Sequence, residues 1–136
     1  MGIPLPTVGL IIIKRRKLLL ALSMNKGCFY LPGGKIDQNE SKEEALCREI
    51  AEELQVELEK TDLEYYTHIT APAFGEKPGV IMEQECYFVK KNIAPLPSAE
   101  IAELQYFTLP EYLNEPSVAP GVVMILKKLK ADNYID

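Results

Sequence analysis

Three closely spaced glutamates, Glu49, Glu52 and Glu53, constrain this chain more than any other feature of its sequence. Spacings of three and four residues place side chains on one side of an α-helix. Like charges at that spacing repel one another, so a helix that keeps them close is expected to have their charge compensated. A hard divalent cation is the natural compensator, because such ions bind carboxylate oxygens.

The segment that carries these glutamates is predicted to be a helix from Ser41 to about Leu54. Ser41 and Glu44 fit a capping box, in which each side chain accepts a hydrogen bond from the backbone amide of the other residue. On a helical wheel Leu46, Ile50 and Leu54 form an apolar stripe, and the three glutamates lie along its border. Isolated charges are costly at such a half-buried position. Mg²⁺ or Mn²⁺ would bind this band and still keep waters and phosphate oxygens as ligands.

Composition indicates one globular domain, spanning residues 1–136. A chain of 136 residues is long enough for one core and too short for two comfortable ones. No apolar run approaches the roughly 20 residues of a membrane span, and the N-terminus lacks the pattern of a signal peptide. Three widely spaced cysteines indicate reduced thiols. We therefore expect a cytoplasmic protein without a membrane partner.

The net charge of −5 is concentrated in one segment. Residues 40–57 contain seven acidic and two basic side chains, and the rest of the chain carries equal numbers of each sign. The basic cluster at residues 14–17 is predicted to be a solvated hairpin turn. Binding of duplex nucleic acid needs a basic field, which this sequence lacks. No stable binding to nucleic acid is expected.

The order of the predicted elements indicates an α/β (α+β) fold. Strands are predicted at residues 7–13, 18–23, 65–73, 80–90 and 104–108, the first two as a hairpin. A short extended piece at residues 30–31 precedes a proline and two glycines. One helical turn is predicted at residues 110–114, and an amphipathic helix at 122–131. The order β-β-α-β-β-β-α implies a mixed sheet with helices on both faces.

Residues 34–56 read Gly, five residues, Glu40, seven residues, then Arg48-Glu49-Ile50-x-Glu52-Glu53-x-x-Val56. This pattern resembles the Nudix box at every specified position except one, and Leu31 to Lys35 resembles the lead-in of the MutT-like branch. The resemblance implies the Nudix fold, an α/β/α sandwich. The departure is Gln55, where the family usually has glycine. Either Gln55 adopts a left-handed conformation, which costs about 1 kcal/mol, or the helix continues for another turn.

The resemblance also implies the roles of the acidic residues. Glu52 and Glu53 would bind the metal directly, and Glu49 would bind a metal or act as a base toward water. Arg48 would hold Glu49 in place through a charge-assisted pair. The backbone carbonyl of Gly33 would complete a metal shell. The ion is expected to be Mg²⁺, with Mn²⁺ as an option.

Further site residues are expected around this core. Lys35 would face the substrate's phosphate, and Glu40 would bind metal through water or brace the loop. Nudix enzymes often draw one more carboxylate from just before the last strand, where Glu100 is preferred over Glu103. Tyr30, Phe74 and Tyr106 are candidates to stack on a base, although aromatic residues in strands are more often core. His68, Glu83 and Glu85 are interpreted as ordinary packed or outward-facing side chains.

The implied reaction is attack of water on the diphosphate linkage of a nucleoside triphosphate or another nucleoside-diphosphate derivative. The main alternative is a non-catalytic Nudix-fold module that binds a nucleotide or a partner protein, although such modules usually lose box glutamates. Isopentenyl-diphosphate isomerase chemistry is a weaker third option. The MutT-like enzyme for oxidised guanine reads its base with an asparagine before the final helix; here Pro120 takes that place and Asn114 lies six residues earlier. Specificity is expected from loops 72–79 and 112–121, and a homodimer is one option for the assembly.

Overall fold

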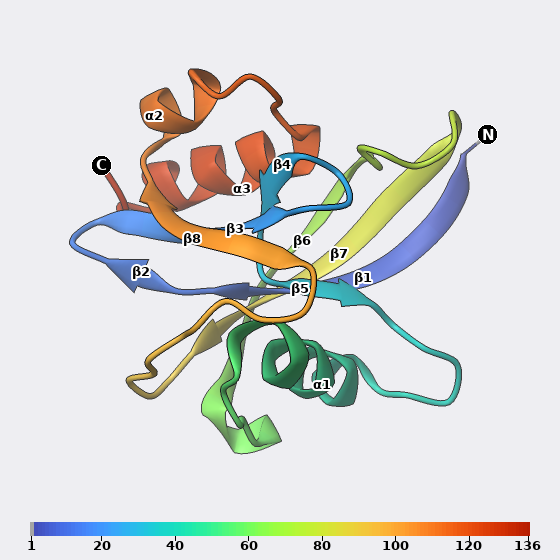
Figure 1. Ribbon diagram of the computed structural model, residues 1–136, viewed down its shortest axis with the longest axis vertical. Helices are drawn as coiled ribbons and strands as arrows, with labels where there is room; N and C mark the ends of the chain where they lie inside the picture. The colour runs from blue at the N-terminus through green and yellow to red at the C-terminus, as the bar shows by residue number, and fades with distance from the viewer. Residues whose placement is uncertain (1) are drawn as a thin grey trace.

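The computed structural model describes residues 2–136 and has two sheets (Figure 1). The first sheet has the strand order β5-β1-β7-β6. Its two central strands, β1 and β7, pair in parallel, and the outer pairs are antiparallel, so this sheet is mixed. The strands are β1 (Ile3–Ile11), β5 (Gly33–Lys35), β6 (Leu63–Pro72) and β7 (Val80–Val89).

The second sheet is antiparallel and is organised around one strand. β3 pairs with β2 and β4 and also with β8. The strands are β2 (Ile13–Lys14), β3 (Lys17–Ser23), β4 (Cys28–Tyr30) and β8 (Ile101–Phe107). The strands of the fold are therefore divided between two four-stranded sheets.

Helices cover both sides of this strand layer (Figure 1). The helix α1 (Lys42–Leu54) lies on one side, and α2 (Leu109–Leu113) and α3 (Pro120–Ala131) lie on the other. A short 3₁₀ helix, η1 (Lys60–Asp62), follows α1. This arrangement confirms the predicted α+β fold with a mixed sheet and helices. No helix within residues 2–136 has the length and apolar character required to cross a membrane.

The helix α1 forms as its sequence predicts. The Ser41 side chain accepts from the Glu44 amide, and the Glu44 side chain accepts from the Ser41 amide, which completes the capping box. Leu46, Ile50 and Leu54 are fully buried. They form one core with residues of β1 such as Val8 and Leu10, while a second core includes residues of β3 and α3.

The helix ends at the unusual box position. Gln55 has φ 55° and ψ 39°, the left-handed conformation, so the first of the two expected outcomes is the observed one. The carbonyls at the helix end do not remain unpaired. The amide of Leu96 donates to the Leu54 carbonyl, and the amide of Ser98 donates to the Glu53 carbonyl, each at 2.9 Å. The linker before β8 thus caps α1 in place of a local glycine motif.

The predicted hairpin of residues 7–13 with 18–23 differs from the structure. β1 ends at Ile11 and pairs with β5 and β7, and only the two residues of β2 pair with β3 before the turn. Arg15 and Arg16 make that turn with positive φ values of 52° and 62°. The strand β5, in the glycine segment, was not predicted. Glycine has a low strand propensity, and here the partner strand supplies the pairing.

Candidate active site

A cleft of about 460 Å³ brings together side chains from several separate segments. Seven of the residues proposed for the site line this cleft: Tyr30, Gly33, Lys35, Glu49, Glu53, Phe74 and Glu100. They come from both sheets, from α1, from the loop between β6 and β7 and from the turn before β8. The fold therefore collects the acidic residues, one lysine and the aromatic pair around one opening.

Glu53 is the most buried charged residue of the cleft, with 6% of its surface exposed. The amide of Gly33 donates to its carboxylate at 3.0 Å. Burial raises the pKa of Glu53, the hydrogen bond from the Gly33 amide lowers it, and the nearby carboxylates of Glu49 and Glu100 raise it, so that the pKa is about 8. A cation bound here would favour the ionised carboxylate.

Glu49 lies beside Glu53 and is also largely buried. Burial raises the pKa of its carboxyl, and the Arg48 guanidinium opposes that rise. A Cβ atom at Gly34 would overlap the Glu49 carboxylate, so a side chain at this position would displace that carboxylate. Glu52 differs from both, because its side chain is 55% exposed and it does not line the cleft.

Arg48 contacts Glu40 more closely than Glu49. Its guanidinium donates to both carboxylate oxygens of Glu40, at 2.7 and 2.9 Å, and to the Lys35 carbonyl at 3.1 Å. The expected contact with Glu49 is present but long, at 3.4 Å. Glu40 also accepts from the Asp37 amide, and these contacts hold the pKa of Glu40 at about 2. This geometry favours loop bracing as the role of Glu40.

The two candidates for the additional carboxylate occupy different positions. Glu100 lines the cleft from the turn before β8, where its carbonyl accepts from the Met24 amide at 2.9 Å. Glu103 lies within β8 opposite Leu22 and is not among the residues that line the cleft. The structure therefore favours Glu100.

The acidic residues fit a hard cation, although they do not form a closed cage. Among residues 2–136, no three His, Cys, Asp or Glu side chains lie close enough together to form a complete metal site. Mg²⁺ does not need such a cage, because it binds through one or two carboxylates and keeps waters and substrate phosphates as further ligands. The half-buried carboxylate of Glu49 and the buried carboxylate of Glu53 provide this kind of partial shell.

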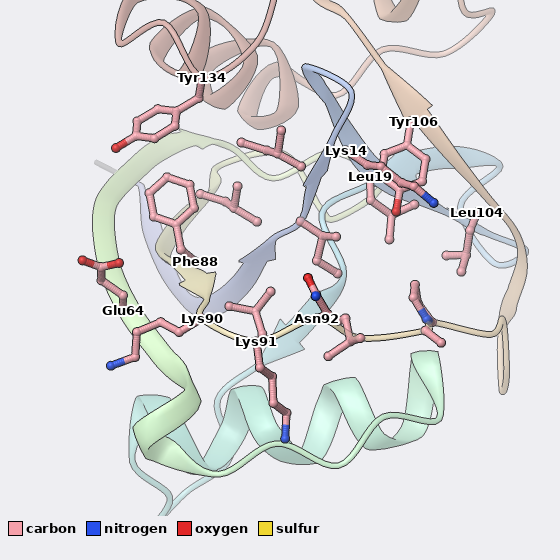
Figure 2. Close-up of a pocket in the computed structure, with 17 residues that line it drawn as sticks. Lys14, Leu19, Glu64, Phe88, Lys90, Lys91, Asn92, Leu104, Tyr106 and Tyr134 are labelled. Atoms are coloured by element: carbon pink, nitrogen blue, oxygen red, sulfur yellow. The ribbon is translucent and has the colours of Figure 1, made fainter.

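The aromatic candidates are separated by the structure. Tyr30 and Phe74 have ring centroids 6.1 Å apart, and the Tyr30 hydroxyl donates to the Phe74 carbonyl at 3.3 Å. Tyr106 does not line the cleft. It lines a second pocket, of about 920 Å³. Figure 2 shows it there with Leu19 and Leu104. Tyr106 therefore lies apart from Tyr30 and Phe74.

His68 lies outside the cleft in a polar cluster on the first sheet. Its two ring nitrogens contact Glu85 at 2.9 Å and Glu83 at 2.7 Å. Met82 and Gln84, which alternate with these glutamates on β7, line the cleft instead. The outward-facing interpretation of Glu83 and Glu85 agrees with this geometry.

The cleft also contains two polar pairs that the sequence did not predict. Lys26 and Glu76 form an ion pair of 3.1 Å at the cleft. Thr7 and Gln84 are partners in the β1–β7 register, and within the described part of the chain the Thr7 hydroxyl is the one buried side-chain polar atom without a hydrogen-bond partner. These pairs join residues that are far apart in the sequence. Alternation along β7 could have placed Gln84 with Met82, but no sequence signal joins Lys26 to Glu76.

The fold and the acidic cleft define the Nudix-type class of hydrolases, which act on phosphoric anhydride bonds. The family model described as NUDIX domain matches residues 4–128, so the chain belongs to the NUDIX domain family. No curated protein sequence matches the chain significantly.

Solved structures support the same assignment. The solution structure of the E. coli ORF135 protein is 28% identical, covers 99% of this chain and 96% of its own, and has a TM-score of 0.71. The MutT NUDIX hydrolase from Burkholderia pseudomallei is 25% identical, with coverage of 92% and 96% and a TM-score of 0.71. The NUDIX domain of Shewanella oneidensis NrtR, complexed with ADP ribose, is 18% identical, with coverage of 97% and 88% and a TM-score of 0.65. At that identity the last of these shows the fold alone.

Proposed function

We propose that this protein is a Mg²⁺-dependent pyrophosphohydrolase that cleaves the diphosphate linkage of a nucleoside triphosphate or another nucleoside-diphosphate derivative. The observation that carries this proposal is the placement of buried Glu53, hydrogen-bonded to the Gly33 amide, in the same cleft as Glu49 and Lys35. Buried carboxylates without a neutralising partner are costly. Their retention in an open cleft indicates a ligand that compensates their charge.

The residues that would hold the cation are Glu49, Glu52, Glu53, Glu100 and the carbonyl of Gly33. When bound, a divalent cation polarises phosphoryl oxygens and neutralises developing charge. Mn²⁺ is a reasonable substitute, because it accepts the same oxygen ligands.

The chain's own residues supply the remaining parts of the reaction. Glu49 would accept a proton from the attacking water, and burial, which raises the pKa of its carboxyl, favours that role. Lys35 lies at the cleft, where it would orient a phosphate group. Tyr30 and Phe74 lie in the same cleft, where they would contact the base.

The cleft is large enough for a nucleotide. Its volume lies within the range of small-molecule sites, roughly 300–1,000 Å³. The solved NrtR domain contains ADP ribose, a nucleoside-diphosphate derivative, in the same fold. Asn114 ends α2 and Pro120 begins α3, and neither lines the cleft. The asparagine that would read oxidised guanine is therefore not found in the cleft, so this feature does not support oxidised guanine as the base.

A substrate panel tests this proposal. Nucleoside triphosphates, dinucleoside polyphosphates, ADP ribose and nucleotide sugars should be incubated with the protein and Mg²⁺ or Mn²⁺. The proposal expects metal-dependent release of phosphate or pyrophosphate from at least one of them. Binding of a nucleotide without hydrolysis would instead support the non-catalytic module.

A further inference from the structure

Three charged side chains from separate segments meet at the cleft. Lys26 follows β3, Lys35 ends β5, and Glu76 lies in the loop between β6 and β7. The Glu76 carboxylate is 3.1 Å from the Lys26 ammonium and 3.7 Å from the Lys35 ammonium. All three residues line the cleft. One carboxylate therefore contacts two cationic side chains from different segments of the chain.

These two lysines are the basic side chains of the cleft. Among the described residues that line it, no arginine or histidine is present, while Asp37, Glu49, Glu53, Glu76 and Glu100 supply five carboxylates. A polyphosphate that enters this acidic opening needs the positive charge of both lysines, together with any bound cation. In the structure, the Glu76 carboxylate pairs with both of these ammonium groups.

Lys26 has a second set of contacts that does not depend on Glu76. Its ammonium donates to the Phe74 carbonyl at 3.4 Å and lies 5.4 Å from the centre of the Tyr30 ring. Both contacts hold the lysine at the cleft. Removal of the Glu76 charge should therefore leave the lysine in position, with its ammonium free to bind another anion.

We propose that Glu76 is an internal counter-ion, which occupies an anion site formed by Lys26 and Lys35 until a phosphate group of the substrate takes its place. The identity of the anion as substrate phosphate rests on the proposed function, whereas the site itself rests on the three contacts above. Ion pairs near the protein surface contribute little to stability, and the Lys26 and Glu76 side chains are 32% and 24% exposed. Displacement of Glu76 is thus a modest cost that lowers affinity without preventing binding.

The competing explanation is that Glu76 only fastens the loop 73–79 over the cleft. The two explanations predict opposite changes in anion affinity when Glu76 is neutralised. If Glu76 competes with phosphate, its neutralisation tightens anion binding. If Glu76 only fastens the loop, its neutralisation loosens the site and weakens anion binding.

Binding of inorganic tripolyphosphate to the full chain in Mg²⁺ buffer, measured by isothermal titration calorimetry, distinguishes them. Glu76→Gln should lower Kd about three- to fivefold, and Glu76→Ala should act in the same direction. Lys26→Gln should raise Kd by a similar factor. When Lys26→Gln and Glu76→Gln are combined, the gain in affinity from Glu76→Gln should be smaller, because one of the two cations that Glu76 neutralises is gone. A melting temperature for each variant confirms that it folds.

A matched control separates local competition from a general change in charge. Asp37→Asn removes one negative charge from the same cleft, but Asp37 contacts Arg48 and neither lysine. Its Kd should change less than twofold. An unchanged or raised Kd for Glu76→Gln, or an equal gain for Asp37→Asn, would overturn the proposal.

The counter-ion proposal and the proposed function can fail separately. If Glu76→Gln tightens tripolyphosphate but no nucleotide in the panel is hydrolysed, the anion site stands and the enzymatic proposal fails. If a nucleotide is hydrolysed but Glu76→Gln does not tighten tripolyphosphate, the enzymatic proposal stands and the counter-ion proposal fails.

Discussion

Replacement of Glu53 by glutamine should stabilise the metal-free protein, and the gain should grow with pH. Burial raises the pKa of Glu53 to about 8 in the folded chain, from an ordinary value of 4.5. Because the folded-state pKa is the higher one, the folded protein binds this proton more tightly than the unfolded chain does. The stability that this bound proton contributes is fully present below the ordinary pKa of 4.5 and is lost as the pH rises through about 8.

The magnitude follows from the two pKa values. One pKa unit corresponds to about 1.4 kcal/mol, so a rise from 4.5 to about 8 corresponds to about 5 kcal/mol once both states are ionised. At pH 7, where the folded-state carboxyl is still mostly protonated, the same two values give about 3 kcal/mol. Glutamine keeps an oxygen that can accept from the Gly33 amide but does not ionise, so Glu53→Gln avoids this loss.

Urea unfolding in EDTA at acidic, neutral and alkaline pH checks this expectation. The two proteins should have similar free energies of unfolding near pH 5, and the variant should be more stable by several kcal/mol near pH 9. Addition of Mg²⁺ should stabilise the wild-type protein more than the variant, because a ligand of the folded state adds to its stability. A variant that is less stable at alkaline pH, or a difference that does not change with pH, would refute the reasoning.

Three further substitutions test separate contacts. Gly34→Ala should fold but lose at least tenfold in kcat, because its Cβ would displace the Glu49 carboxylate; steady-state kinetics measures this. Gln55→Gly should raise the free energy of unfolding by about 0.5–1 kcal/mol, since it removes the left-handed strain at the end of α1; a loss of stability in urea would argue against that strain. Arg48→Lys should cost about 1 kcal/mol in the same assay, because lysine cannot donate to both Glu40 oxygens through a planar fork.

The helix α1 could be predicted from the sequence because its signals are local. The capping box of Ser41 and Glu44 fixes its start, and the spacing of its leucines and isoleucine fixes its buried face. The same helical wheel predicts that the three glutamates lie along the border of this face. The acidic side of the site can therefore be predicted from the sequence of α1 alone.

The division into two sheets could not be predicted in the same way. β1 pairs in parallel with β7, more than 70 residues later in the chain, and hydrophobic alternation does not specify such a partner. The pair of Lys26 and Glu76 depends on this topology as well. Arg48 has several carboxylates within reach, and only the folded loop shows that Glu40 receives its shortest hydrogen bonds.

The most direct test of the central claim is nucleotide hydrolysis by the wild-type protein and by Glu53→Gln, each with Mg²⁺ and with EDTA. We expect the wild-type protein to release phosphate or pyrophosphate from at least one nucleotide of the panel only when the metal is present. The variant should lose at least a hundredfold in rate while its fold remains intact by urea unfolding. Equal hydrolysis by the variant, or hydrolysis by the wild-type protein that persists in EDTA, would show that Glu53 and the metal are not part of the reaction.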